Sequence, residues 1–373
     1  MRKFAVYLPQ FHSFPENDEW WGKNFTEWVS VKNAEPLWED HDQPKVPLND
    51  KYYNLLDKDT VFWQTDLMHQ YRIDGFTYYH YYFNGKLLME KPAENLLKWT
   101  DVDQPFFFYW ANHTWRRSWE GKSTVLIEQT YGDISDWRRH FDYLLPFFKD
   151  SRYEKKNNKP LFQIFLDFPE KEAMFKCFDD WCKEEGFDGI YLIETYNKGT
   201  FFPDDLQLFI NRMSSTASAL SIRQPSFGFN YFDHVIRKTP ERVTRAIMKR
   251  IGKTFRIGKW ILRYDGNRIW SMMTDATLMI REVLKSAGRA DVELIPGFCF
   301  EWDNTPRHNY RGFIITPPDK EHFKSFMNSI ISYDFLQINA WNEWAEGMML
   351  EPTENNGYKY LEWIHEWVED HER

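Results

Sequence analysis

Short apolar runs alternate with amphipathic stretches along nearly the whole chain of 373 residues. Short runs rich in β-branched and aromatic residues indicate strands, and apolar residues at helical spacing indicate helices. Strands that alternate with helices predict a parallel sheet whose neighbouring strands are joined by helical crossovers. The predicted strands are Phe4–Phe11, Ile73–Tyr82, Pro105–Asn112, Pro160–Phe165, Gly189–Tyr196, Ser226–Tyr231, Glu293–Phe300 and Phe335–Trp341.

Eight strands are the number that closes a TIM barrel, so we predict a single (β/α)8 barrel of the α/β class with long loops at its C-terminal face. No linker rich in Gly, Ser or Pro divides the sequence, and residues 1–373 are expected to form one domain. The predicted helices are Asp59–Tyr71, Ile134–Phe148, Glu170–Glu185, Asp204–Ala219, Glu241–Gly252, Met273–Ser286, Lys320–Ser332 and Tyr358–Asp370. The sixth predicted strand is short and contains Gly228. The stretch Phe14–Asn54 lacks periodicity, which is typical of a long functional loop.

Two carboxylates stand three residues apart among tryptophans, in the segment Trp341-Asn342-Glu343-Trp344-Ala345-Glu346-Gly347 after the last predicted strand. Hydrolysis of a glycosidic bond needs such a pair, one carboxyl to protonate the leaving oxygen and one to act as base or nucleophile. Alternation along the strand places Glu343 on the face that points into the barrel, at the end where barrel active sites lie. We therefore predict that Glu343 and Glu346 are catalytic. The alternative is that both are charges of a surface loop.

Aromatic and polar side chains also gather at the ends of other predicted strands. His80 is expected to share a face with Tyr78 and Tyr82, where substrate binding and a hydrogen-bonded core position are equal alternatives. Glu194 is a candidate either for the site or for an ion pair. The full set of predicted substrate-binding residues is Tyr7, Trp21, Glu27, Trp28, His80, Trp110, Asn112, His113, Trp302, Asp303, Trp341 and Asn342.

Composition narrows the class of ligand and the compartment. Aromatic residues make up 19% of the chain, including 18 Trp and 20 Tyr, and their flat faces with polar handles suit sugars. A net charge of −9 argues against nucleic acid as a partner. Three cysteines form no disulfide framework, and the sequence shows neither a signal peptide nor an apolar run long enough to span a membrane. A cytoplasmic protein is therefore expected.

Other chemistries find little support in the sequence. It has no glycine-rich phosphate loop, no His-Glu-x-x-His zinc helix and no nucleophile elbow, so neither a cofactor nor a metal is expected. The stretch from Lys238 to Asn267 is basic, which is typical of a solvated helix face; an anionic ligand or partner is the alternative.

Specific motifs follow one another in order from the first predicted strand to the last. They are Tyr7-Leu8-Pro9-Gln10-Phe11-His12, Trp20-Trp21-Gly22 with Phe25-Thr26-Glu27-Trp28, Asp74-Gly75-Phe76 with Tyr79-His80-Tyr81, Trp110-Ala111-Asn112, Trp302-Asp303-Asn304-Thr305-Pro306-Arg307 and the segment that carries Glu343 and Glu346. Together these motifs resemble the WbsX-type family. This group is similar to glycoside hydrolase family 99 and is often encoded with bacterial surface-polysaccharide biosynthesis.

The resemblance implies a TIM barrel and a mechanism. Enzymes of family 99 are retaining, endo-acting α-mannosidases and α-mannanases. By resemblance, Glu343 would be a base that deprotonates the sugar's own 2-hydroxyl, which attacks the anomeric carbon and gives a 1,2-anhydro sugar. Glu346 would protonate the leaving oxygen and then activate water. Glu346 would have to be protonated at working pH, which a partly desolvated aromatic pocket favours.

One position departs from the family pattern. Trp-Ala-Asn is commonly followed by Glu in that family, whereas His113 stands here. A carboxylate is thus replaced by a group that is neutral or cationic. The resulting hypothesis is a hydrolase of α-linked, mannose-like or rhamnose-like polysaccharide or O-antigen units. Its rivals are a glycosyltransferase or transglycosylase of surface-polysaccharide biosynthesis, and a non-catalytic glycan-binding barrel.

Overall fold

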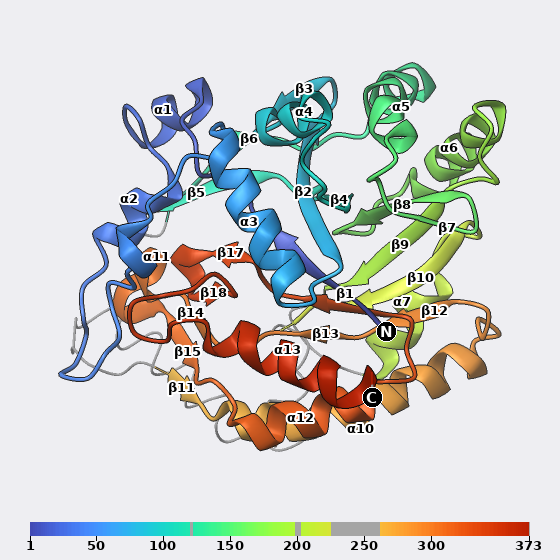
Figure 1. The fold of residues 1–373 in the computed structure, drawn as a ribbon. Helices are drawn as coiled ribbons and strands as arrows, with labels where there is room; N and C mark the ends of the chain where they lie inside the picture. Colours follow the sequence, from blue (N-terminus) through green and yellow to red (C-terminus); the bar gives the residue numbers. More distant parts are fainter. Residues whose placement is uncertain (120–121, 198–202, 225–261, 373) are drawn as a thin grey trace.

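A barrel of parallel strands forms the centre of the molecule in the computed structural model, which describes residues 1–119, 122–197, 203–224 and 262–372 (Figure 1). Its strands are β1 (Arg2–Tyr7), β2 (Gly75–Phe83), β4 (Phe106–Trp110), β8 (Lys159–Ile164), β9 (Tyr191–Tyr196), β10 (Ala217–Ile222), β12 (Glu293–Ile295), β13 (Gly297–Phe298) and β16 (Phe335–Ile338). They pair in the order β12-β10-β9-β8-β4-β2-β1-β16-β13, and every pairing along this path is parallel.

The two strands at the ends of that path bring the ends of the sheet together. β12 pairs with β10, β13 pairs with β16, and only Pro296 separates β12 from β13 in the sequence. Proline has no N–H for a ladder, which accounts for the break. Its carbonyl still accepts a 2.9 Å hydrogen bond from the Gln337 backbone N–H. β12 and β13 therefore share one position, and the barrel has the eight positions of the predicted (β/α)8 fold.

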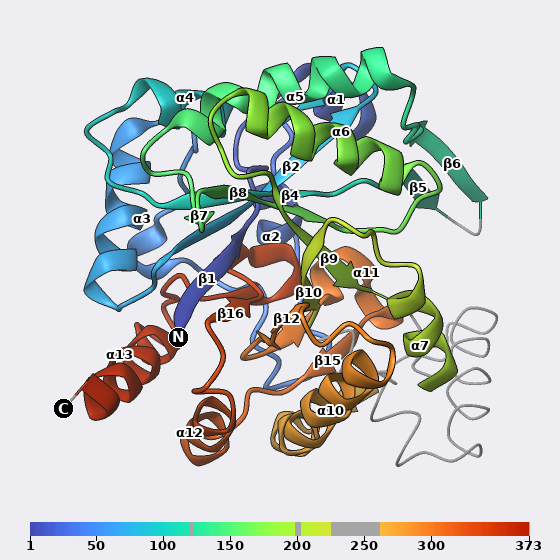
Figure 2. The same ribbon diagram turned by 90° about the vertical axis from the view of Figure 1, so that its right-hand side faces the viewer.

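Helices pack around the outside of the barrel (Figures 1 and 2). They are α3 (Lys58–Gln70), α4 (Lys91–Lys98), α5 (Ile134–Lys149), α6 (Lys171–Glu184), α7 (Pro203–Asn211), α10 (Gly266–Ser286), α12 (Lys320–Ser329) and α13 (Lys359–Glu372). Asp57, Asp133, Asp265 and Asp319 cap the first turns of α3, α5, α10 and α12 by accepting backbone N–H groups. Each such cap stabilises its helix by about 1 kcal/mol. Of the helices in the described ranges, none combines the length and the apolar character that a membrane span needs.

The predicted position of the sixth strand is wrong. The segment Ser226–Tyr231 lies outside the described residues, and β10 fills the sixth position by pairing with β9 and β12. The predicted helix Asp204–Ala219 overlaps β10, whereas α7 ends at Asn211. The predicted helix Glu241–Gly252 and nearly all of the basic stretch after Lys238 also lie outside the described residues.

Short elements occupy the connections. α1 (Pro15–Trp21), α2 (Glu27–Lys32) and η1 (Leu48–Asp50) lie within the stretch predicted as a long loop, so that loop carries structure of its own. β5 and β6 form an antiparallel hairpin, and β11, β15 and β14 form a separate small sheet. The remaining elements are β3 (Lys86–Leu88), β5 (Trp115–Trp119), β6 (Lys122–Ile127), β7 (Lys155–Lys156), β11 (Leu262–Tyr264), β14 (Trp302–Asp303), α11 (Thr305–His308), η2 (Asn309–Arg311), β15 (Phe313–Ile315), β17 (Asn342–Glu343), η3 (Trp344–Glu346) and β18 (Met348–Met349).

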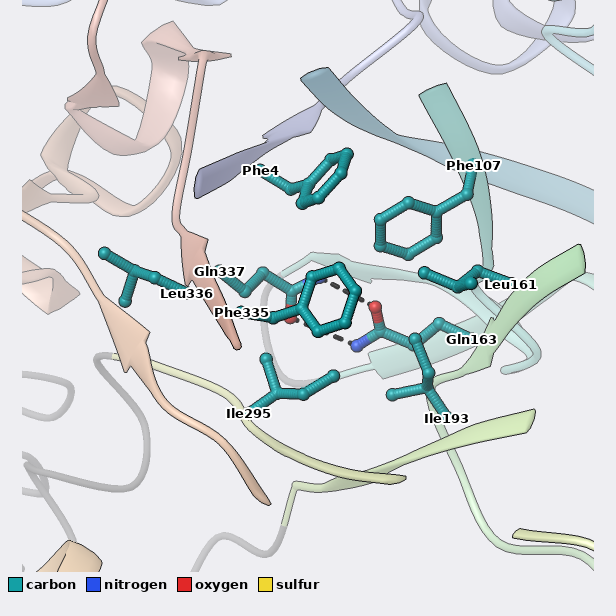
Figure 3. A pocket seen from close by; sticks show the side chains of 9 residues that line it. All are labelled: Phe4, Phe107, Leu161, Gln163, Ile193, Ile295, Phe335, Leu336 and Gln337. Atoms are coloured by element: carbon teal, nitrogen blue, oxygen red, sulfur yellow. Dashed lines mark hydrogen bonds between the residues drawn. The ribbon is translucent and has the colours of Figure 1, made fainter. Parts of the chain in front are cut away.

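Side chains fill the interior of the barrel. Phe4, Phe107 and Phe335, from the amino-terminal halves of their strands, lie around a small cavity lined mainly by apolar groups (Figure 3). Gln163 of β8 and Gln337 of β16 come from opposite sides of the barrel and exchange two hydrogen bonds, of 3.1 and 2.7 Å. The barrel is thus a packed core, and the place for a functional site is the rim at the carboxyl ends of the strands.

Candidate active site

The two glutamates lie on a folded segment that follows β16. Glu343 ends β17 and pairs with Met348 of β18, and Glu346 ends the intervening turn η3. Gly347 follows with a φ of 61°, a left-handed conformation that favours glycine. A Cβ at Gly347 would lie 3.0 Å from the backbone nitrogen of Asp303, so the turn packs closely against β14. The segment holds both carboxyl groups at the carboxyl end of the barrel.

Glu343 is a buried carboxyl group, with 6% of its surface exposed. Burial and the neighbouring Glu346 raise the pKa of Glu343 to about 8, against the opposing effect of Arg307 and Arg223. Loss of hydration disfavours the charged form, and a second negative charge adds to the penalty. Glu343 therefore holds its proton near neutral pH, which is the state that a proton donor needs.

Glu346 accepts hydrogen bonds from two neighbours. The Trp302 indole N–H donates to its Oε2 at 3.1 Å, and the Arg307 guanidinium pairs with its Oε1. The other end of the same guanidinium lies 3.0 Å from Oε2 of Glu27. Although burial opposes its charge, these carboxylates raise the pKa of Arg307. The ion pair with Arg307 requires an ionised carboxylate. Because the same guanidinium contacts Glu27, Arg307 links the first loop to the segment that follows the last barrel strand.

Tyrosine side chains of β2 and β4 lie within the electrostatic reach of Glu343. Burial raises the pKa of Tyr79 and Tyr81, and the Glu343 charge adds to the effect. The rings of Tyr79 and Tyr109 stack with their centroids 5.2 Å apart, and burial raises the pKa of Tyr109 to about 12. All three phenols therefore stay neutral, and they give the site an aromatic wall with hydroxyl groups.

A second guanidinium lies at the end of β10. The Cζ of Arg223 lies 4.8 Å from the centre of the Phe165 ring, and the His113 ring lies 5.1 Å from the same ring. Arg223 acts electrostatically on both Glu343 and Glu346. The carboxyl ends of β4, β8 and β10 thus contribute an imidazole, an aromatic ring and a cation, in that order, to the same region.

A buried carboxyl group supports the turn between the two glutamates. The Glu351 carboxyl accepts hydrogen bonds from the Trp344 indole at 2.6 Å, the Tyr53 hydroxyl at 2.7 Å and the Gln64 amide at 2.7 Å. Burial raises the pKa of Glu351 to about 7, although these hydrogen bonds oppose the shift. Because Trp344 belongs to η3, this buried network holds the turn in position.

His80 faces away from the two glutamates, which corrects the prediction that it lies at the site. Its Nε2 lies 2.8 Å from the Nε2 of His140 on α5, outside the barrel. Successive residues of a strand point to opposite faces, so Tyr79 and Tyr81 point inward where His80 points outward. Of the two alternatives for His80, the structure places it in a hydrogen-bonded core position.

Four further predicted residues pack within the protein. The Tyr7 hydroxyl donates to Gln64 on α3, which places Tyr7 outside the barrel as well. The others are Trp28, whose indole donates to the Tyr53 carbonyl at 2.8 Å, Trp110, whose indole donates to the Tyr82 carbonyl at 3.1 Å, and Trp341, whose ring lies 4.8 Å from that of Phe76. Their contacts support the strands that carry the site.

Two predicted asparagines bridge neighbouring chain segments with their side-chain amides. Asn112 accepts from the Leu166 N–H at 2.8 Å and donates to the Leu166 carbonyl at 2.9 Å. Asn342 does the same with Leu8, accepting at 2.7 Å and donating at 3.0 Å. In both cases the amide takes the place of a peptide group and extends the sheet ladder beyond the end of a strand.

Asp303 is buried, whereas Trp21 is exposed. Oδ2 of Asp303 accepts from Gln43 at 2.8 Å and lies 2.9 Å from His41 Nε2, and Oδ1 accepts from Thr305. These contacts fasten the first loop to β14. Trp21 is 37% exposed on α1, with its ring centroid 5.8 Å from that of Phe25.

The remaining acidic candidate lies away from the pair. Glu194 forms a buried ion pair with Lys171 at 2.6 Å, which is the second of its two predicted roles. Among the described residues, no group of three His, Cys, Asp or Glu side chains has a spacing that could hold a metal ion.

Several residues of the site were not among the predicted ones. Arg307 ends the motif Trp302-Asp303-Asn304-Thr305-Pro306-Arg307, and a charged residue in a motif with aromatic and polar groups was the available signal. Tyr79 and Tyr81 were missed because the inward face of β2 was assigned to its neighbours. Arg223 follows β10 directly, so a correct sixth strand would have placed it at the rim.

Comparisons with known proteins place this chain among relatives of common fold. A family model described as "Glycosyltransferase WbsX" matches residues 3–364. Two proteins from strains of Xanthomonas campestris pv. campestris, each named "Uncharacterized protein WxcX", are 29% and 30% identical over 382 and 370 aligned residues. Each match covers 96% of this chain and 48% of the relative, so the chain spans about half the length of these curated relatives.

Solved structures share the architecture at low sequence identity. The GH99 endo-α-mannosidase from Bacteroides thetaiotaomicron, in complex with BIS-TRIS-propane, matches with a TM-score of 0.57 and 12% identity over 99% of this chain and 97% of that one. A "Glycoside hydrolase-like protein" matches with a TM-score of 0.61 and 13% identity over 98% and 93% of the two chains. At these identities the likeness shows the fold, which confirms the predicted TIM barrel.

Proposed function

The chain belongs to the WbsX family, whose model is described as glycosyltransferase, and from that premise we propose that it is a carbohydrate-active enzyme. In the first instance we propose a retaining glycoside hydrolase that cleaves α-linked, mannose-like units of a bacterial polysaccharide. The observation that carries the proposal is the pair Glu343 and Glu346 at the carboxyl end of the barrel, one buried with a raised pKa and one paired with Arg307. Such a pair supplies the acid and the base that glycosidic bond cleavage needs.

The proposed reaction uses both carboxyl groups in turn. Glu343 takes the proton of the 2-hydroxyl, and the freed oxygen attacks the anomeric carbon while Glu346 protonates the leaving oxygen. A 1,2-anhydro sugar results. Glu346 then takes a proton from water, the hydroxide opens the anhydro ring at the anomeric carbon, and Glu343 returns its proton to the 2-oxygen. The net result is hydrolysis with retention, and both carboxyl groups end as they began.

The structure favours the opposite distribution of the proton, since the pKa of Glu343 is raised to about 8 and Glu346 is paired with Arg307. The proposed roles therefore require that substrate separates Arg307 from Glu346 and that one proton passes from Glu343 to Glu346. The assignment that needs no transfer makes Glu343 the acid.

Hydrolysis of glycosyl fluorides decides between the two assignments, because fluoride leaves without protonation. The Gln variant of the true acid still releases fluoride in the first turnover but loses cleavage of the natural linkage, whereas the variant of the base loses both.

The first test of the function is product release. The wild-type chain, Glu343→Gln and Glu346→Gln are incubated with α-linked bacterial and yeast mannans and with O-antigen polysaccharides, and released oligosaccharides are measured by mass spectrometry. We expect product from the wild type alone, at a rate at least 100-fold above either variant, because each carboxyl group supplies a step of proton transfer worth about 10²–10⁴-fold. Wild-type activity in both variants would contradict the proposal.

Transfer is the second candidate, favoured by the description of the family model. A transglycosylase would use the same two carboxyl groups, with a sugar hydroxyl in place of water. A donor-dependent glycosyltransferase would bind a nucleotide sugar, which calorimetry measures directly. Saturable binding of a nucleotide sugar together with no released product would replace hydrolysis by transfer.

A further inference from the structure

Arg223 is a cation at the rim for which the protein provides no anionic partner among its described residues. The side chain contacts the Phe165 ring, and its Nε is buried without a hydrogen-bond partner. Arg307 is different, since it pairs with two carboxylates. A guanidinium that forms no ion pair with the described residues keeps N–H donors for an anion that arrives with the ligand.

His113 adds a second unsatisfied polar group beside the same ring. Its Nδ1 is buried without a hydrogen-bond partner. Burial and the nearby Arg223 lower the pKa of His113 to about 4, so the imidazole is neutral at pH 7 and offers one N–H. The imidazole and the guanidinium thus contact the same aromatic ring, an arrangement that suits a sugar ring with an acceptor-rich substituent.

This region adjoins the catalytic pair. Arg223 interacts electrostatically with Glu343 and Glu346, yet no described carboxylate comes within ion-pair distance of its guanidinium. Within the described part of the rim, Arg307 pairs with Glu27 and Glu346, whereas Arg223 forms no ion pair. One unpaired positive charge matches one negative charge, which favours a carboxylate over a phosphate dianion.

We propose that Arg223 and His113 form a subsite for a sugar carboxylate, so that the polysaccharide bound by this chain contains acidic residues of the uronic acid type. This inference rests on the proposed function, since it assigns a substrate class to the same site. The guanidinium would receive both carboxylate oxygens through parallel N–H···O bonds, His113 would donate a further hydrogen bond, and Phe165 would contact the apolar face of the ring.

The test compares acidic sugars with neutral partners of the same shape. Calorimetry on the wild-type chain at pH 7 uses α-linked trigalacturonate against its methyl ester, and methyl α-mannopyranosiduronate against methyl α-mannopyranoside. We expect at least one acid to bind about tenfold or more tightly than its partner, which is the effect of one charge-assisted contact. Equal or absent binding within both pairs overturns the proposal, and tighter binding of mannose 6-phosphate than of either acid overturns the choice of a carboxylate.

Variants locate the preference. Arg223→Gln should reduce the ratio of the two affinities to about one, and Arg223→Lys should retain part of it because the charge remains. Arg263→Gln is the matched control, since that exposed arginine also lies over an aromatic ring, that of Trp38. His113→Glu gives Arg223 a carboxylate within the protein and should abolish the preference, while His113→Gln should keep it. A preference that survives Arg223→Gln contradicts the inference.

Binding and turnover are separate readouts in this design. A chain that prefers acids but cleaves nothing would refute the proposed hydrolysis alone. A chain that cleaves neutral mannans and shows no preference for acids would refute the subsite alone. Thermal unfolding of each variant confirms that it is folded before its affinities are compared.

Discussion

Arg307 holds Glu27 and Glu346 on one guanidinium, whereas no ion pair with Glu343 is formed by any described residue. Burial and the charge of Glu346 keep the proton on Glu343. The site therefore holds a proton on Glu343 near neutral pH. Either assignment of acid and base uses that single proton, so its loss stops the reaction.

The activity should therefore fall as the pH rises through about 8. Below that value Glu343 is protonated, because its pKa is raised to about 8; above it both carboxyl groups are ionised and no acid remains. Arg307→Gln removes a charge that favours ionisation of Glu343, so the alkaline limb of kcat/KM should move to higher pH. The measurement is a pH–rate profile of the free enzyme, with the exposed Arg263→Gln as control. A limb that stays in place after Arg307→Gln would separate Glu343 from the titration.

Two asparagine side chains near the site form the hydrogen bonds that peptide groups would form in a strand ladder. Asn342 pairs with the N–H and carbonyl of Leu8, and Asn112 pairs in the same way with Leu166. These contacts join the end of the last strand to the first, and the end of β4 to the end of β8. The rim is thereby held by the same kind of bond that holds the barrel, which keeps Glu343 in register with the first strand.

Asn342→Asp should destabilise the protein. The substitution keeps the shape but replaces the donor that faces the Leu8 carbonyl with an acceptor, which leaves a buried polar group unpaired at a cost of about 1–3 kcal/mol. We expect a lower midpoint in urea unfolding and, because β17 carries Glu343, a lower kcat. Asn211→Asp is the control, since the exposed Asn211 oxygen already accepts a hydrogen bond. Equal stability of the two variants would show that the amide does not hold the rim.

The face of β2 that points into the barrel could not be predicted from its sequence. All nine of its residues are buried, because the strand lies between the packed interior and the surrounding helices. Alternation separates the faces of a strand only when one of them meets water, so it gave no means of choosing between His80 and Tyr79. The glutamate pair was easier to propose, because two carboxylates among tryptophans are unusual in any environment. β10 was missed because its sequence Ala-Ser-Ala-Leu-Ser-Ile is weakly apolar.

Across the whole molecule, a polar layer separates the apolar base of the barrel from the charged rim. Gln163 and Gln337 bond across the interior, and Ser221 and Thr195 bond to them at 2.8 and 3.0 Å. The overall architecture was predictable because short apolar segments alternate with amphipathic ones along most of the chain. The polar layer was not, since a glutamine within a strand reads as a surface residue until its partner across the barrel is known.

Gln337→Leu should cost more than the loss of one side chain suggests. The change leaves Gln163 and Ser221 without the oxygen they bond to, and each unsatisfied buried group costs about 1–3 kcal/mol. Gln163→Leu should also destabilise, while the double variant should be less destabilised than the sum of the two. Chemical unfolding of the four proteins measures this double-mutant cycle. Strict additivity would mean that the two amides do not depend on each other.

The break at Pro296 leaves the seventh strand position of the barrel weakly paired. The seventh position consists of pieces of three and two residues, and few ladder bonds tie it to β10 on one side and β16 on the other. Short pairings open most easily in thermal motion. β10 leads to Arg223 and β16 leads to Glu343, so opening of these short pairings would change the distance between the guanidinium and the two carboxyl groups. In the proposed hydrolase, such opening would let the site accept sugars of different size.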